Sequence, residues 1–221
     1  MKLNSNIRQT FRVAKIELSS MFYSPVAWLV LIIFALLIGY DYANIFDSQL
    51  HSQSLGNNLW SVSSAIYNSW MTGILKPILR NLYLYIPLIT MGLMSREYQS
   101  GSVKLLYSSP IKNSSIILGK YLAMMCYGAA LMSIIGLNVL FSWLTVENFQ
   151  ISMLLVGMLG IYLLILAYSA IGLFMSTLTA YQVVAAIGTL AVLAVLNFIG
   201  DVGQSIDFVR DITFWLSLIH I

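Results

Sequence analysis

The sequence has few charged residues. Only 9% of its 221 residues are Asp, Glu, Lys or Arg, whereas 59% are hydrophobic, and soluble domains carry about 25% charged residues. Residues 148–200 contain no charged side chain at all. A helix of about 20 apolar residues crosses the hydrocarbon core of a bilayer, so this stretch has the length of two crossings. The scarcity of charge argues against a soluble globular domain and predicts a chain embedded in lipid.

Cysteine and histidine are also scarce. Cys126 is the only cysteine, so the chain can form neither an internal disulfide nor a cysteine-based metal cluster. Its place in an apolar run predicts a small core residue. The two histidines, His51 and His220, stand in polar loop and terminal sequence without a nearby carboxylate cluster of ligand spacing. We therefore expect no metal site, no cofactor and no catalytic residue.

A phosphate-binding loop of the Gly-x-x-x-x-Gly-Lys-Ser/Thr kind is missing as well. The nearest match, Gly119-Lys120, is followed by Tyr121 and does not fit the pattern. The chain is therefore not expected to hydrolyse ATP, and any large soluble activity must come from a partner.

Residues 1–24 have the pattern of an amphipathic helix that lies on a membrane surface and then runs into Pro25. Apolar residues recur on one helical face and basic or polar residues on another. The apolar face holds Ile7, Phe11, Ala14, Leu18 and Phe22, and the other holds Arg8, Arg12, Lys15 and Ser19.

Five apolar stretches have the length of membrane spans. In the second span Pro77 and Pro87 each remove a backbone donor, so we expect a kink or a break there. The expected fold is an all-α polytopic membrane protein with an interfacial amino-terminal helix and five visible transmembrane helices. The spans cover residues 25–45, 74–94, 116–144, 151–174 and 183–199, and polar connections are expected at 47–69, 95–115, 145–150 and 176–182.

The distribution of cations predicts the orientation. Eight of the eleven Lys and Arg residues flank one side of this topology, and only Lys76, Arg80 and Arg210 fall on the other. Cytoplasmic loops carry an excess of Lys and Arg, so the amino terminus and loop 95–115 are expected in the cytoplasm. The eight are Lys2, Arg8, Arg12, Lys15, Arg96, Lys104, Lys112 and Lys120.

Loop 95–115 carries a recognisable series of residues. It reads Arg96-Glu97-Tyr98-Gln99-Ser100-Gly101-Ser102-Val103-Lys104-Leu105-Leu106, then Ser109-Pro110-Ile111, and Gly119-Lys120 follows at the start of the next span. This series resembles the loop between spans 2 and 3 of ABC-2-type permeases, where Glu, a Gly-Thr/Ser pair, paired leucines, Pro and a closing Gly-Lys recur. Val103-Lys104 departs from the family pattern, in which an acidic residue often follows the Gly-Thr pair. Among these permeases the chain looks closest to those of gliding-motility and related bacterial systems.

The resemblance implies the remaining assignments. It implies a non-catalytic permease subunit in the bacterial inner membrane, multi-pass, with the amino terminus cytoplasmic. The partners implied are a separate cytoplasmic ABC ATPase, a second permease subunit in a homodimer or heterodimer, and membrane lipid, with no nucleic acid. The expected division is an interfacial helix at 1–24, an ABC-2-type transmembrane domain at 25–202 and an extracytoplasmic segment at 203–221. Because the family has six spans, we expect the native protein to continue beyond this segment.

By the same resemblance, loop 95–115 holds the element that couples the ATPase to the spans. Coupling requires an element with two arrangements that both sites bias, and a short helix between two spans would serve. Gly101 would supply a backbone break, Leu105 and Leu106 an apolar contact, and Arg96 with Glu97 a charged rim. Pro110 closes the segment.

Three other functions are compatible with a polytopic membrane chain. An ion-coupled secondary transporter usually has ionisable groups within its spans. The fourth and fifth spans contain no charged residue, and the third contains only Lys120, at the end counted above with the cytoplasmic cations. An intramembrane enzyme would need a nucleophile with a base, or a carboxylate pair, inside the bilayer, and neither is visible. A membrane scaffold that transports nothing stays open. The substrate of a permease is not indicated by the sequence.

Overall fold

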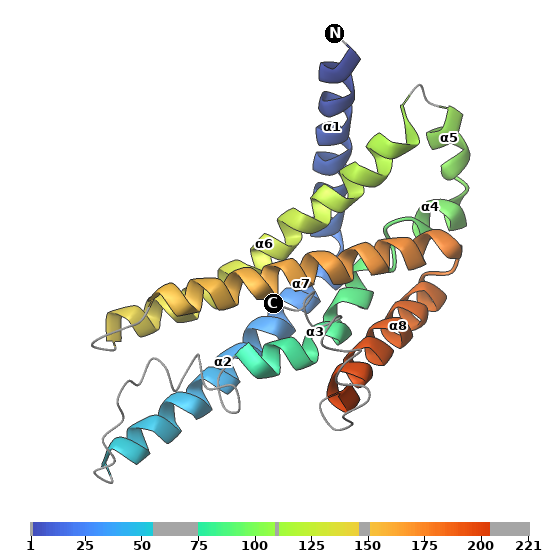
Figure 1. Ribbon diagram of the computed structural model, residues 1–221. Helices are drawn as coiled ribbons and strands as arrows, with labels where there is room; N and C mark the ends of the chain where they lie inside the picture. The colour runs from blue at the N-terminus through green and yellow to red at the C-terminus, as the bar shows by residue number, and fades with distance from the viewer. Residues whose placement is uncertain (1, 55–74, 109–110, 146–150, 204–221) are drawn as a thin grey trace.

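The computed structural model describes residues 2–54, 75–108, 111–145 and 151–203, and these ranges form eight α-helices and no β-strand (Figure 1). The predicted all-α class is confirmed. The helices are α1 Lys2–Tyr23, α2 Pro25–Ser54, α3 Leu75–Thr90, α4 Ser95–Ser100, α5 Val103–Ser108, α6 Asn113–Thr145, α7 Ile151–Leu178 and α8 Gln182–Gly203.

Five stretches of the described chain are long and apolar enough to cross a membrane. Each overlaps one predicted span, because a run of about 20 apolar residues is visible in the sequence itself. The stretches are Pro25–Ser48, Pro77–Ser100, Asn113–Leu144, Leu154–Leu178 and Gln182–Ile199. The expected carboxyl-terminal segment, from residue 204 onward, and most of the expected loops at 47–69 and 145–150 lie outside the described residues.

Two predicted boundaries were wrong. Helix α2 continues to Ser54, past the predicted end of its span at Ile45, because residues 46–54 include neither Gly nor Pro to stop it. The predicted polar link at 176–182 is only residues 179–181, and Ser176 is buried inside α7. Its hydroxyl serves a buried hydrogen-bond network rather than solvent.

The expected break in the second span lies between α3 and α4. Helix α3 continues past Pro87 to Thr90, residues 91–94 form a turn, and α4 starts at Ser95. In the turn the amide of Leu93 donates to the carbonyl of Thr90 at 3.1 Å. This bond spans three residues, as in a 3₁₀ turn, whereas an α-helical bond spans four. The second span is therefore a helix with its last part turned aside.

Helix α7 lies in the middle of the bundle, packed against α3, α6 and α8, while α2 packs on α3 and α6 (Figure 1). Two tyrosine hydroxyls tie α2 to α6: that of Tyr127 donates to the carbonyl of Ala27 at 2.7 Å, and that of Tyr42 lies 2.7 Å from the hydroxyl of Ser142. Such interhelical bonds matter in lipid, where apolar burial drives association only weakly. Fully buried core side chains include Phe34, Leu82, Ile86, Leu131 and Ile165.

Helix α1 confirms the predicted helix at the amino end. It lies against the first part of α6 and runs across the direction of α7 rather than along it (Figure 1). The predicted apolar face is divided: Ala14 is buried and Leu18 and Phe22 pack toward the core, whereas Ile7 and Phe11 stay exposed. One half of this face therefore packs against the bundle, and the other half is exposed.

Cys126 was expected in the core, and this was wrong. Its side chain is exposed on α6. A membrane helix is apolar on its lipid-facing side as well as on its packed side, so an apolar run does not reveal which side is buried.

Gly119 is where α1 and α6 come closest. A Cβ at Gly119 would lie 2.7 Å from the Cβ of Val13 and 2.9 Å from the backbone carbonyl oxygen of Thr10. Since a backbone atom is involved, a side-chain rotation alone cannot make room. The glycine permits the contact that holds α1 on the bundle.

We therefore predict that Gly119→Ala destabilises the protein by about 1–3 kcal/mol, the usual range for an overpacked contact. Thermal unfolding of the purified protein in detergent would measure this as a lower Tm. Gly136→Ala on the same helix is the control, because a Cβ there would have no atom within 4 Å. Equal Tm values for the two variants would contradict the close approach.

Candidate functional site

The residues expected to couple the spans to a partner lie on two short helices that follow the broken span. Arg96 and Glu97 are on α4, Gly101 is in the turn after it, and α5 carries Leu105 and Leu106. Pro110 lies outside the described residues. Both short helices lie near the start of α6, and α4 also lies near the link between α7 and α8 (Figure 1).

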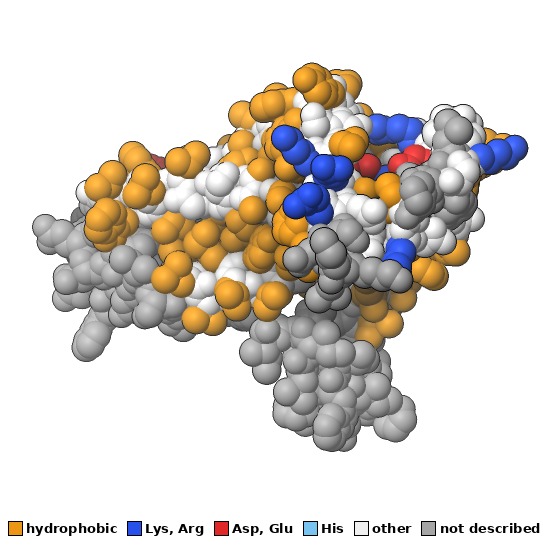
Figure 2. All heavy atoms as spheres, turned by 90° about the horizontal axis from the view of Figure 1, so that it is seen from above, with side chains coloured by type: hydrophobic (Ala, Val, Ile, Leu, Met, Phe, Trp, Pro, Cys, Tyr) orange, Lys and Arg blue, Asp and Glu red, His pale blue; other side chains and the backbone are white. Residues whose placement is uncertain are grey.

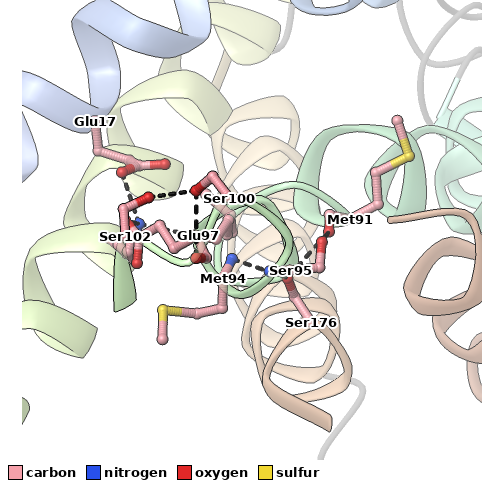
Figure 3. Close-up of polar contacts among 10 residues, drawn as sticks. Glu17, Met91, Met94, Ser95, Glu97, Ser100, Ser102 and Ser176 are labelled. Carbon is pink, nitrogen blue, oxygen red and sulfur yellow. Dashed lines mark hydrogen bonds and ion pairs between the residues drawn. The ribbon is translucent and has the colours of Figure 1, made fainter. Parts of the chain in front are cut away.

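The start of α4 is capped from another helix. Met94 stands at the N-cap position and has no side-chain oxygen to accept from the first amides of α4. The hydroxyl oxygen of Ser176 on α7 accepts from the amides of Met94 and Ser95 at 2.9 and 3.1 Å, and it donates to the carbonyl of Met91 at 3.0 Å. Figure 3 shows Ser176 directed at this turn. One buried hydroxyl thus satisfies three backbone groups at the break in the span.

The end of α4 is set by Gly101. Its φ of +72° is left-handed, and its amide donates to the carbonyl of Tyr98 at 3.2 Å. Side chains with a Cβ disfavour this region, so glycine suits the position. The backbone break predicted at Gly101 is confirmed. The exposed side chain of Gln99 accepts a hydrogen bond of 3.4 Å from Gln182, the first residue of α8.

A buried lysine joins α4 to the amino-terminal helix. Lys120 on α6 is only 2% exposed, and its ammonium lies 2.8 Å from Oε2 of Glu17 on α1 and 2.7 Å from Oε1 of Glu97 on α4. It also donates to the carbonyl of Leu93 at 2.6 Å. We call Lys120, Glu17 and Glu97 the Lys120 cluster. The ammonium thus donates to Glu17 and to the carbonyl of Leu93, and it forms an ion pair with Glu97.

Of the two residues predicted to form a charged rim, only Arg96 points outward. Arg96 is exposed as expected, but Glu97 turns inward toward Lys120, and Figure 3 shows its side chain on the same side as Glu17. The other oxygen of this carboxylate, Oε2, is buried without a hydrogen-bond partner among the described residues.

Beside α4 the surface is hollowed. A cavity of about 180 Å³ opens between α4, the start of α6 and the end of α7. Apolar side chains predominate in its lining, and no group of His, Cys, Asp and Glu within the described chain has the arrangement of a metal site. The lining residues are Met94, Tyr98, Asn113, Ile116, Ile117 and Thr177.

The same end of the molecule carries exposed positive charge. Figure 2 shows Lys and Arg side chains gathered toward one end, with Asp or Glu side chains between them. A surface of this sign attracts anionic groups, whether on lipid headgroups or on a protein. The exposed cations on α1, on α4 and α5, and just before α6 are Arg8, Arg12, Lys15, Arg96, Lys104 and Lys112.

The family model for "ABC-2 family transporter protein" matches residues 11–206. The chain belongs to the ABC-2 transporter family. No curated protein and no solved structure matches it. The match covers α1 from Phe11 onward and all five membrane-crossing stretches, so the resemblance first noted in one loop extends over most of the chain.

Family membership settles the general role of the protein. It is a multi-pass membrane protein with the role of an ABC-type permease, and in this family the membrane component is typically not the catalytic one. Such a component associates with an ABC ATPase. In this ABC-2 family protein, α4 is joined to α1 and α6 through Lys120, to α7 through Ser176 and to α8 through Gln182.

Sequence reasoning missed Ser176, Glu17 and the role of Lys120. In the sequence Lys120 stands out only as part of a Gly-Lys pair and as one of the eight cations on the side expected to be cytoplasmic. A signal was present, since a lysine within a predicted span must find partners inside the protein. Its two carboxylates are far from it along the chain, however, and nothing in the local pattern identifies them.

We predict that Ser176→Ala loosens the turn between α3 and α4, because the amides of Met94 and Ser95 lose their acceptor. Each unsatisfied buried group costs about 1–3 kcal/mol. Hydrogen–deuterium exchange of peptides covering residues 91–98 should therefore be faster than in the wild type.

Ser133→Ala is the control for Ser176→Ala, because the hydroxyl of Ser133 is exposed and bonds only the carbonyl of Ala130 in its own helix. Exchange at residues 91–98 that stays slow in Ser176→Ala would show that this hydroxyl does not hold the turn.

Proposed function

We propose that this chain is the membrane-spanning permease subunit of an ABC transporter that moves its substrate with ATP hydrolysed by a separate cytoplasmic subunit. The observation that carries the proposal is the position of α4. This helix is the last part of the second span. It has polar contacts with α6, α7 and α8 and, through Lys120, with α1. A motor that displaces α4 acts on several membrane helices at once.

In this proposal the 97–110 segment is the surface on which the ATPase acts. Helix α5 carries Leu105 and Leu106 and is joined to α4 through the Gly101 turn, so force on α5 reaches α4 through two residues. The exposed cation Lys104 lies within the segment and Lys112 lies just after it, and both complement acidic groups of a partner. The chain supplies the moving part, and the partner supplies ATP hydrolysis.

The orientation and assembly follow from the same arrangement. The end that carries α4, α5 and the exposed cations is cytoplasmic, in keeping with the positive-inside rule, and the amino terminus is on that side of the bacterial inner membrane. A second permease subunit completes the transporter. The outer face of α8 offers apolar surface for it, including Val183, Ile187 and Phe198, and α2 is the second candidate for the pairing face.

We predict that replacing Leu105 and Leu106 together with Ala weakens binding of the ATPase. If both are buried against it, the lost apolar contact corresponds to about 2–4 kcal/mol, which is more than tenfold in affinity. Co-purification of the ATPase with the membrane subunit, and the ATP hydrolysis rate of the complex, would measure the effect. Gly101→Val should instead leave binding intact and lower coupled hydrolysis, because φ of +72° opposes a branched side chain.

The matched control is Leu137→Ala with Leu140→Ala, two exposed leucines in the membrane part of α6. This variant loses the same side-chain volume away from the segment and should bind the ATPase normally. All variants should insert into the membrane. Normal ATPase binding by the Leu105–Leu106 variant would leave the segment an ordinary connector and remove the basis of the proposed coupling.

A further inference from the structure

The Lys120 cluster joins α1 and α4 to α6, and α1 packs on α6 over a larger interface than α4 does. Glu17 belongs to α1, a helix of 22 residues that packs along α6 more extensively than any other pair of described helices pack together. Gly119 lets their backbones approach next to Lys120 itself. The Lys120–Glu17 pair thus lies inside a broad and close interface.

Glu97 is attached more loosely. It belongs to α4, a helix of six residues between the turn at residues 91–94 and the left-handed Gly101. Its side chain is 26% exposed, compared with 17% for Glu17. Its Oε2 has no hydrogen-bond partner among the described residues, so the attached state leaves one buried acceptor unsatisfied.

The charges of the cluster also favour release of Glu97 over release of Glu17. Two carboxylates share one ammonium, which gives the Lys120 cluster a net charge of −1 when both glutamates are ionised. If Glu97 leaves, Lys120 and Glu17 remain as a neutral pair, and the freed carboxylate gains water on both oxygens. If Glu17 left instead, the contact between α1 and α6 would have to open.

We infer that Lys120 is a positioning residue for coupling, which holds Glu97 and so α4 in one of two positions while it stays paired with Glu17 in both. The inference rests on the proposed function for its purpose, since ATP would drive the exchange through the ATPase. Helices α1 and α6 form the fixed part, and α4 detaches from it when Glu97 is released.

The test is a distance measurement by double electron–electron resonance between spin labels attached to introduced cysteines. The sample is the chain with its ATPase in lipid nanodiscs. Cys126 is first replaced by Ser. One pair joins Arg12 on α1 to Ser100 on α4, and the control pair joins Arg12 to Ser114 on α6; all three labelled positions are exposed. Magnesium–ATP should lengthen the first distance and leave the control distance unchanged.

Two isosteric variants separate the roles of the carboxylates. Glu97→Gln weakens the releasable contact, so the longer Arg12–Ser100 distance should already be populated without ATP, at least several-fold above the wild type, with Tm little changed. Glu17→Gln should lower Tm and leave the Arg12–Ser100 distribution without ATP as in the wild type. Both variants keep Lys120, so its burial without any partner does not arise.

A static ion pair would give a different result. If Glu97→Gln leaves the Arg12–Ser100 distribution unchanged, or if both label pairs move together, the inference is wrong, whether or not the ATPase binds. Conversely, a shift in Glu97→Gln in the chain alone, with no ATPase bound by any variant, would support the releasable contact and contradict the proposed function. The two failures are therefore distinguishable.

Discussion

The buried ammonium of Lys120 ties the short helix α4 to the rest of the helix bundle. Removing Lys120 from water costs several kcal/mol, and this cost is offset only because two carboxylates and a backbone carbonyl surround it. The three acceptors come from α1, from α4 and from the turn before α4. Helix α6 therefore fixes where the amino-terminal helix and the turned-aside end of the second span lie.

The break in the second span has a comparable physical basis. In a bilayer, backbone groups that leave the helical pattern must be satisfied within the protein. Ser176 supplies an acceptor for two amides and a donor for one carbonyl at this break, so α3 can end and α4 can begin at a depth where α7 still covers the chain. The polar contacts of Ser176 and Lys120 together place α4 beside α1, α6 and α7.

Much of the fold was predictable because hydropathy is a local property. The five spans, the amphipathic first helix and the break at Gly101 follow from residue types within a few positions of each other. A break in the second span is also expected from its two prolines, but both prolines lie inside α3 and the break comes at residues 91–94. The pattern did not reveal where α2 ends, because no residue near Ile45 stops a helix. Nor did it reveal that Cys126 faces outward, because both sides of α6 are apolar.

The site was predictable only in outline. A family resemblance identified the segment that contains Arg96, Glu97 and Gly101, but it did not show that Glu97 is bound internally. That contact depends on Lys120 and on the packing of α1 against α6, which brings Glu17 next to a residue about a hundred positions away. Pairings of this kind are decided by tertiary packing, and a single sequence holds no record of them.

Lysine-specific crosslinking of the protein with its ATPase in native membranes, read by mass spectrometry, tests the central claim most directly. Lys104 and Lys112 are exposed at the end that carries α4 and α5, whereas Lys76 lies near the start of α3, at the opposite end of the broken span. If the ATPase binds at α4 and α5, it crosslinks to Lys104 or Lys112 and not to Lys76. Crosslinks to Lys76, or an ATPase that co-purifies without any crosslink to Lys104 or Lys112, would contradict the account.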